Sequence, residues 1–156
     1  MTSLENWEFA SYVVTVVALP WAIMLFWWEQ RRERQNEEEE IYQKLSDEYA
    51  DFQTLLLNNA DLRLNTGSIP DAELTAEQVE RKSIIFDLLM SLFERAYILV
   101  HEDDMSPQQQ RLWASWADYI DVWCRRPDFR LAAIELLNGE DPGFEAYMRK
   151  ALAKYD

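Results

Sequence analysis

Residues 9–28, FASYVVTVVALPWAIMLFWW, carry no Asp, Glu, Lys, Arg or His. A helix rises about 1.5 Å per residue, so a run of about 20 apolar residues matches the hydrocarbon thickness of a bilayer. A helix on the surface of a globular core shows a polar stripe, whereas this run is apolar on every side. We therefore expect a transmembrane helix over residues 9–28, with a buried core helix as the alternative.

The residues that border this run predict its orientation. Two tryptophans end the run and three arginines follow it, namely Trp27, Trp28, Arg31, Arg32 and Arg34. Tryptophan favours the headgroup level of a membrane, and an excess of Arg marks the cytoplasmic side. Residues 1–8 contain two glutamates and no Lys or Arg, which also makes a cleaved signal peptide a poor fit. We expect a retained anchor with the N-terminus outside and the C-terminus in the cytoplasm.

One face of the expected span carries small side chains. These are Ser11, Thr15, Ala18 and Ala22, which follow one another at steps of four, three and four residues. Small residues on one face let two membrane helices approach closely. The spacing predicts helix packing within the membrane, against a membrane protein partner or against a second copy of this chain. Pro20 lies in the same segment and predicts a kink.

The rest of the chain is strongly acidic. After residue 28 it carries 27 acidic residues against all 15 of its Lys and Arg, and such a surface repels nucleic acid. Four consecutive glutamates, residues 37–40, would also repel the anionic leaflet that the arginines attract. We expect four segments: a short external N-terminus (1–8), the membrane helix (9–28), a charged juxtamembrane connector (29–40) and an acidic helical domain (41–156).

Helical periodicity and capping signals recur throughout residues 41–156. An apolar repeat begins at Ile41 and should end near Asn58 and Asn59. Helix starts are expected at Thr75, Ser106, about 128 and Asp141. The helix that starts at Thr75 has two apolar faces, one of which contains Ile85, Leu88, Leu92 and Leu99, so we expect it to lie at the centre of the bundle with apolar neighbours on both faces. The sequence thus predicts an all-α protein, with one N-terminal transmembrane helix followed by a cytoplasmic bundle of four to five helices.

The third expected helix, residues 107–125, carries four aromatic residues on one side. They are Trp113, Trp116, Tyr119 and Trp123. Aromatic stripes at helical spacing usually lie in a core, and large aromatic residues are also enriched in the hot spots of protein interfaces. The stripe is therefore either core or a partner-binding surface.

Residue types that support catalysis are scarce. No glycine-rich phosphate loop occurs, and the single histidine, His101, cannot supply a metal site. We expect His101 at a helix C-terminus and the single cysteine, Cys124, as a buried small hydrophobe. Asp87 and Glu94 could act as paired carboxylates, although we expect them to be hydrogen-bonded or paired to Arg95, Arg125 or Arg130. We assign no catalytic, cofactor-binding or metal residues and predict that the chain is not an enzyme.

Four stretches support a family resemblance: LLLNNADLRL (55–64), LFERAYIL (92–99), WASW (113–116) and RRPDFR (125–130). Their layout resembles that of uncharacterised bacterial single-span membrane proteins with a small cytoplasmic helical domain, which are grouped as domains of unknown function. The resemblance implies a single-pass protein of the bacterial inner membrane. It carries no catalytic residues across.

These observations lead to two functional hypotheses. The first is a non-enzymatic, membrane-anchored helical binding protein that contacts lipid and serves as an accessory subunit or scaffold of an inner-membrane complex, with a cytoplasmic protein partner. The alternative is a small membrane effector or pore-forming component, for example in phage defence, that acts through oligomerisation of its span.

Overall fold

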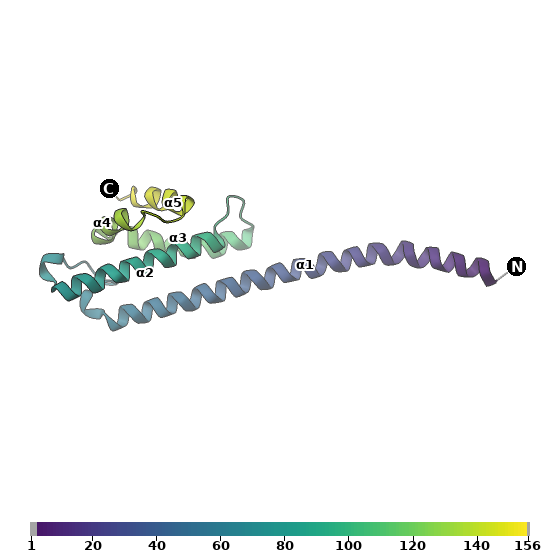
Figure 1. Cartoon of the computed structure of the whole chain (residues 1–156), viewed down its shortest axis with the longest axis horizontal. Coiled ribbons are helices and arrows are strands. Elements are labelled where there is room, and N and C mark those ends of the chain that lie inside the picture. Colours follow the sequence, from purple (N-terminus) through teal and green to yellow (C-terminus); the bar gives the residue numbers. More distant parts are fainter. Residues whose placement is uncertain (1–2, 156) are drawn as a thin grey trace. The chain divides into compact units, whose positions relative to one another are not determined.

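The computed structural model describes the backbone of residues 3–155 and the side chains at 18–33 and 39–155. Within residues 3–155 every regular element is a helix, which confirms the all-α prediction. The elements, shown in Figure 1, are α1 (Ser3–Asn58), η1 (Ala60–Leu62), η2 (Asp71–Glu73), α2 (Ala76–Val100), α3 (Pro107–Cys124), α4 (Pro127–Leu136) and α5 (Pro142–Leu152). The chain divides into two compact units, Met1–Gln43 and Lys44–Asp156, here called unit 1 and unit 2.

Side-chain caps start three helices of unit 2, namely α2, α3 and α5. Thr75 and Ser106 each form a capping box, in which the side-chain hydroxyl accepts a backbone N–H three residues on. The third start is Asp141, whose carboxylate accepts the N–H groups of Gly143 and Phe144 at 2.9 and 3.0 Å. These starts, and the end of α1 at Asn58, confirm the helix boundaries predicted from the sequence.

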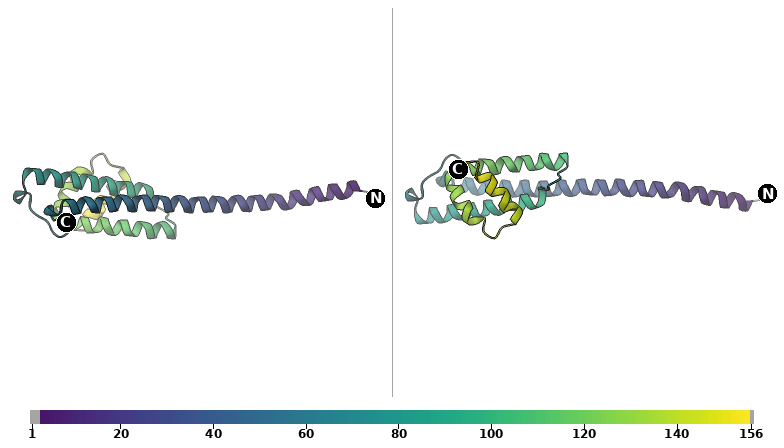
Figure 2. Two further views of the ribbon diagram at one scale, coloured as in Figure 1. Left: turned by 90° about the horizontal axis from the view of Figure 1, so that it is seen from below. Right: turned by 90° about the horizontal axis from the view of Figure 1, so that it is seen from above.

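Unit 2 is layered. Figures 1 and 2 show the last part of α1 on one side of α2 and α3, with α4 and α5 on the other side. Trp123 of α3 lies at the centre, with its ring centroid 6.0 Å from Phe52 of α1, 6.1 Å from Phe86 of α2 and 5.7 Å from Phe129 of α4. All four rings are buried, so one side chain joins four helices in a single core.

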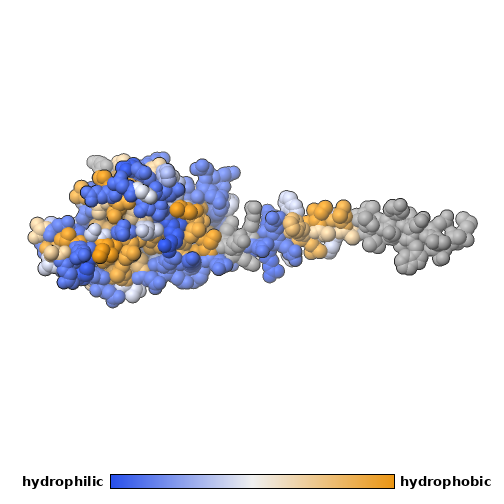
Figure 3. Space-filling view, viewed as in Figure 1, coloured by the Kyte–Doolittle hydropathy of each residue, from blue (hydrophilic) through white to orange (hydrophobic). Residues whose placement is uncertain are grey.

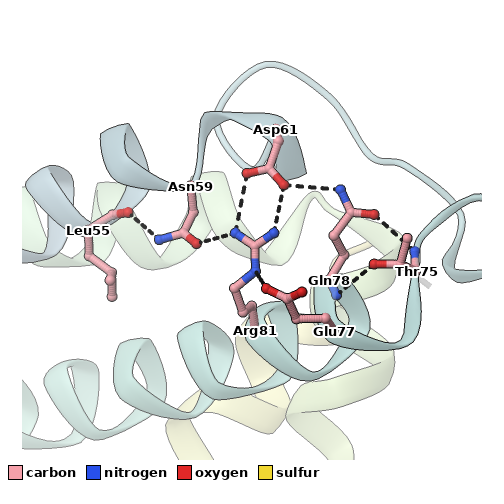
Figure 4. Close-up of polar contacts among 7 residues, drawn as sticks. All are labelled: Leu55, Asn59, Asp61, Thr75, Glu77, Gln78 and Arg81. Carbon is pink, nitrogen blue, oxygen red and sulfur yellow. Dashed lines mark hydrogen bonds and ion pairs between the residues drawn. The ribbon is translucent and has the colours of Figure 1, made fainter.

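A polar network fastens the end of α1 to the start of α2 (Figure 4). Arg81 donates to the side chain of Asn59 at 2.7 Å and to Asp61 at 2.8 Å. Asn59 in turn donates to the carbonyl oxygen of Leu55, and Gln78 donates to Asp61 at 3.0 Å. These hydrogen bonds to Gln78 and Arg81 lower the pKa of Asp61. These bonds join the start of the α1–α2 connection, at Asn59 and Asp61, to the first turns of α2.

A second, more buried cluster of charges holds the middle of the same connection. Lys82, the buried charged residue of α2, pairs with Asp71 of η2 and lies 3.8 Å from Asp128 of α4. Arg126 bonds Asp128 at 2.9 Å and also donates to the carbonyl oxygen of Leu64 at 2.6 Å. A buried cation needs such partners because its charge has left water. The cluster binds residues 64–71 to α2 and α4.

The second apolar face expected on α2 is only half buried. Ile85 and Leu92 lie in the core as predicted, whereas Leu88 and Leu99 are exposed. The prediction was wrong for these two residues because α1 covers only part of that face. The core of unit 2 therefore includes Ile85 and Leu92 of this face but not Leu88 or Leu99.

The central aromatic contacts make Phe129 a test of the packing. Its side chain has no exposed surface, and Phe→Ala substitutions at such sites typically cost about 3–5 kcal/mol. We expect Phe129→Ala to lower the free energy of unfolding by an amount in that range, measured by urea denaturation of the purified protein. Leu131→Ala, at a residue of the same helix that is 72% exposed, should change it by less than about 0.5 kcal/mol. Equal effects of the two substitutions would contradict this packing.

Candidate functional site

Unit 1 presents a continuous set of exposed apolar side chains, here called the apolar segment. Its members are Leu19, Trp21, Ile23, Met24, Leu25, Phe26, Trp27 and Trp28, each 42–72% exposed. Ala18, Pro20 and Ala22 between them are exposed as well, and Figure 3 shows the apolar colouring of this stretch. No described part of the chain covers the segment. Removing a Leu, Ile, Phe or Met side chain from water is worth about 1.5–3 kcal/mol, so these residues favour an external apolar environment.

Several residues singled out in the sequence lie in this part of α1. Trp27, Trp28, Arg31 and Arg32 are exposed, and Arg31 lies beside Trp28 in a shallow groove that Trp21 and Met24 also line. Ala18 and Ala22 are exposed one turn apart. The side chains of Ser11, Thr15 and Arg34 lie outside the described residues. Among the described residues, no helix has an apolar stretch of the length that crossing a membrane requires.

The aromatic stripe of α3 belongs to the core. Trp113, Trp116 and Trp123 are buried, and Tyr119 is half-buried. Tyr119 stacks on Tyr49 of α1, with ring centroids 4.3 Å apart. Of the two interpretations left open by the sequence, burial therefore places the three tryptophans in the core and leaves only part of Tyr119 for a partner.

His101 follows α2 as its C-cap, where the sequence placed it, and donates its backbone N–H to Tyr97. The imidazole stacks on the ring of Tyr97 with centroids 4.5 Å apart, and it makes a T-shaped contact with the ring of Trp113 with centroids 5.0 Å apart. Tyr147 of α5 completes the cluster. The ring of His101 is thus packed among aromatic side chains of three helices.

Cys124 is fully buried at the end of α3. Burial, and secondarily the charge of Asp121, raise the pKa of its thiol to about 12. A thiolate is the reactive form of cysteine, so this residue is suited to packing and poorly suited to nucleophilic chemistry. The expected role as a small buried hydrophobe is in agreement with this environment.

A pair of carboxyl groups joins α2 to the turn before α5. Glu94 accepts the backbone N–H of Asp141 at 2.6 Å and shares a hydrogen bond with Glu140. That hydrogen bond, together with burial and the negative charges of Glu94 and Asp87, raises the pKa of Glu140 to about 7. The shared hydrogen bond requires a proton on one of the two carboxyl groups.

The pairing of Glu94 with Glu140 was not predicted from the sequence. Arg95, one expected partner, instead bonds Glu48 at 2.7 Å, and Arg125 bonds Asp121 at 2.8 Å. The Asn138-Gly139 pair in the sequence indicates a turn, and Gly139 adopts a φ of 100° in it. That signal does not reveal which helix the turn will meet. Within the described residues, no three His, Cys, Asp or Glu side chains are grouped closely enough to hold a metal ion.

Comparison with known proteins adds no relative: no protein family, curated protein or solved structure matches this chain. The class of molecule is therefore defined by its own structure, an all-α chain with an exposed apolar helix segment and a small helical unit.

The carboxyl pair predicts a pH dependence of stability. The pKa of Glu140 is higher in the folded chain than the ordinary value of 4.5, so the folded state holds this proton more tightly. The stabilisation is complete below about pH 4.5 and is lost as the pH rises through about 7. We expect the urea midpoint of the native chain to fall between pH 5 and 8 relative to that of Glu140→Gln, which keeps the hydrogen bond without a titrating group. The exposed Glu135→Gln should follow the native profile, and a profile unchanged by Glu140→Gln would refute the shared proton.

The environment of Cys124 predicts slow thiol chemistry. We expect the folded protein to react with iodoacetamide at pH 8 far more slowly than the protein in urea, because the thiol must leave the core and lose its proton first. Ala114→Cys in a Cys124→Ser background provides the control, since position 114 of the same helix is exposed. Labelling of native Cys124 as fast as that of the control would contradict its burial.

Proposed function

We propose that this chain is a membrane-anchored helical protein that acts by binding, as an accessory subunit or scaffold of a membrane complex. The apolar segment carries this proposal, because eight large apolar side chains are exposed within ten residues. Lipid is the environment that accepts apolar side chains on every side of a helix.

The sequence before the apolar segment supports the same conclusion. Residues 9–28 contain nine Leu, Ile, Val or Phe residues, which contribute on the order of −3 to −5 kcal/mol to membrane insertion. Trp27 and Trp28 would then lie at the headgroup level, with Arg31 and Arg32 on the cytoplasmic side. Unit 2 would be cytoplasmic, which fits a bacterial inner membrane protein with its N-terminus outside.

Binding by unit 2 is supported by its surface. Ile84, Leu88 and Ile98 of α2 are all exposed. The core of unit 2 is formed by other side chains, many of them aromatic, and these three residues remain on the surface. Exposed apolar residues that lie together on one surface are typical of interaction sites.

Ala18 and Ala22 favour a second candidate function. They are small, exposed and four residues apart, so they could form the contact between spans of an oligomer. The chain would then be a small effector that permeabilises the membrane, as some phage-defence components do.

Membrane anchoring predicts a clear fractionation result. In bacterial expression the chain should pellet with membranes and resist alkaline carbonate. Ile23→Arg combined with Phe26→Arg should release a large part of it, because each arginine adds about 2.5–3.5 kcal/mol to the cost of insertion. The matched pair Leu131→Arg and Ile134→Arg, at exposed residues of α4, should leave it in the membrane. Native protein found in the soluble fraction would refute the proposal.

Overexpression separates the two candidate functions. The binding protein should leave growth and dye exclusion intact, and a C-terminal fluorescent protein should fold in the cytoplasm. Growth arrest with dye leakage that Ala18→Leu or Ala22→Leu abolishes would instead establish the pore-forming effector, because the larger side chains block close packing of the spans.

A further inference from the structure

A groove runs between α1 and α2 within unit 2, here called the α1–α2 groove. Phe52 and Leu55 of α1 and Leu88 and Leu92 of α2 form its apolar surface. Phe52 and Leu92 are buried, whereas Leu88 remains 49% exposed. The core of unit 2 therefore opens to solvent along this line.

Exposed apolar residues also lie on α2 beyond the groove, namely Ile84, Ile98 and Leu99. The spacing of Ile84, Leu88, Ser91, Arg95 and Ile98 follows one side of the helix. At about 1.5 Å per residue this side is about 21 Å long, with the polar Ser91 and Arg95 between its apolar ends. Its length matches about four turns of a partner helix, and an amphipathic helix in an apolar groove is a recurrent mode of recognition.

The charged side chains around the groove indicate the charge of the partner that it would bind. Glu48 and Asp51 lie along the α1 side of the groove, and Glu80 and Asp87 are exposed on α2. Arg95, the cation that lines the groove, is already bonded to Glu48 at 2.7 Å. A cationic helix would therefore meet Asp51 at the groove itself, while Glu80 and Asp87 add negative charge to the exposed surface of α2.

A second copy of this chain is a poorer fit. Residues 44–156 hold 21 Asp and Glu against 12 Lys and Arg, so two copies docked through this groove would bring like charges together. Like-charge contacts at an interface are costly and select against that partner. Charge complementarity favours a partner helix rich in Lys or Arg.

We propose that the α1–α2 groove binds a cationic amphipathic helix of a partner protein. The apolar side of that helix contacts Leu55 and Leu88, and its Lys or Arg side chains pair with Asp51 and Asp87. This inference deepens the proposed function, on which it rests for the claim that the chain acts by binding, and it names the surface and the chemistry of the partner.

The test uses the full chain in nanodiscs of a zwitterionic lipid, so that the disc itself does not attract a cationic peptide. The probe is a fluorescein-labelled helical peptide of 18 residues, with Leu at i, i+3, i+4 and i+7 spacing and Lys elsewhere, titrated by fluorescence anisotropy. Empty nanodiscs measure its binding to lipid. A second peptide with Glu in place of every Lys tests the charge requirement.

We expect saturable binding of the Lys peptide and none of the Glu peptide. Leu88→Lys should weaken binding by roughly tenfold or more, as expected for a residue at the centre of an interface. Leu131→Lys, at an exposed residue of α4, adds the same charge elsewhere and should leave the affinity within about twofold. Asp51→Lys should weaken binding and reduce its dependence on salt.

Three outcomes would overturn the inference. One is the absence of saturable binding to the native chain, and another is equal weakening by Leu88→Lys and Leu131→Lys, which would show diffuse attraction to an acidic surface. The third is concentration-dependent dimerisation of the native chain that Leu88→Lys abolishes, which would make a second copy the occupant. Leu88→Ser repeats the test if Leu88→Lys lowers the urea midpoint. If the peptide does not bind but the chain still fractionates with membranes, the proposed role of the α1–α2 groove is refuted. The proposed membrane anchoring is then unaffected.

Discussion

The apolar segment of α1 requires an environment that the described residues of this chain do not provide. In most soluble domains a helix hides its apolar side chains against a neighbour, and the hydrophobic effect then contributes to the free energy of folding. Here Leu19 to Trp28 are exposed on every side, so the same free energy is available for partition into lipid. The arginines that follow fit the proposed anchor, since Arg next to a membrane helix favours the cytoplasmic side.

Unit 2, in contrast, buries its apolar side chains in a core of its own. Its interior depends on aromatic side chains of α3, with Trp123 in contact with rings from α1, α2 and α4. Two clusters of charges then hold the α1–α2 connection, one around Arg81 and the other around Lys82. With the tryptophans in the core, the surface that we propose for partner binding lies along α1 and α2, where exposed apolar side chains lie near acidic ones.

Features set by neighbouring residues were predictable, whereas features set by packing were not. Thr75, Ser106 and Asp141 start helices through bonds to residues two or three positions away, and such bonds can be read from the sequence. Helical spacing placed Trp113, Trp116 and Trp123 on one side of a helix but left open whether that side is core or a partner surface, and only the packing shows that they are buried. The exposure of Leu88 and the contact of Glu140 with Glu94 depend on which helix lies beside which, and no local pattern contains that information. The groove and the carboxyl pair were missed for this reason.

The depth of the apolar segment in a bilayer tests the central claim most directly. A nitroxide spin label at Met24→Cys, in a Cys124→Ser background reconstituted into lipid vesicles, can be compared with a label at Leu99→Cys on the exposed surface of α2. Membrane anchoring predicts that oxygen relaxes the label at position 24 more strongly than a water-soluble nickel complex does, with the opposite order at position 99. Equal access of the nickel complex to both labels would contradict it.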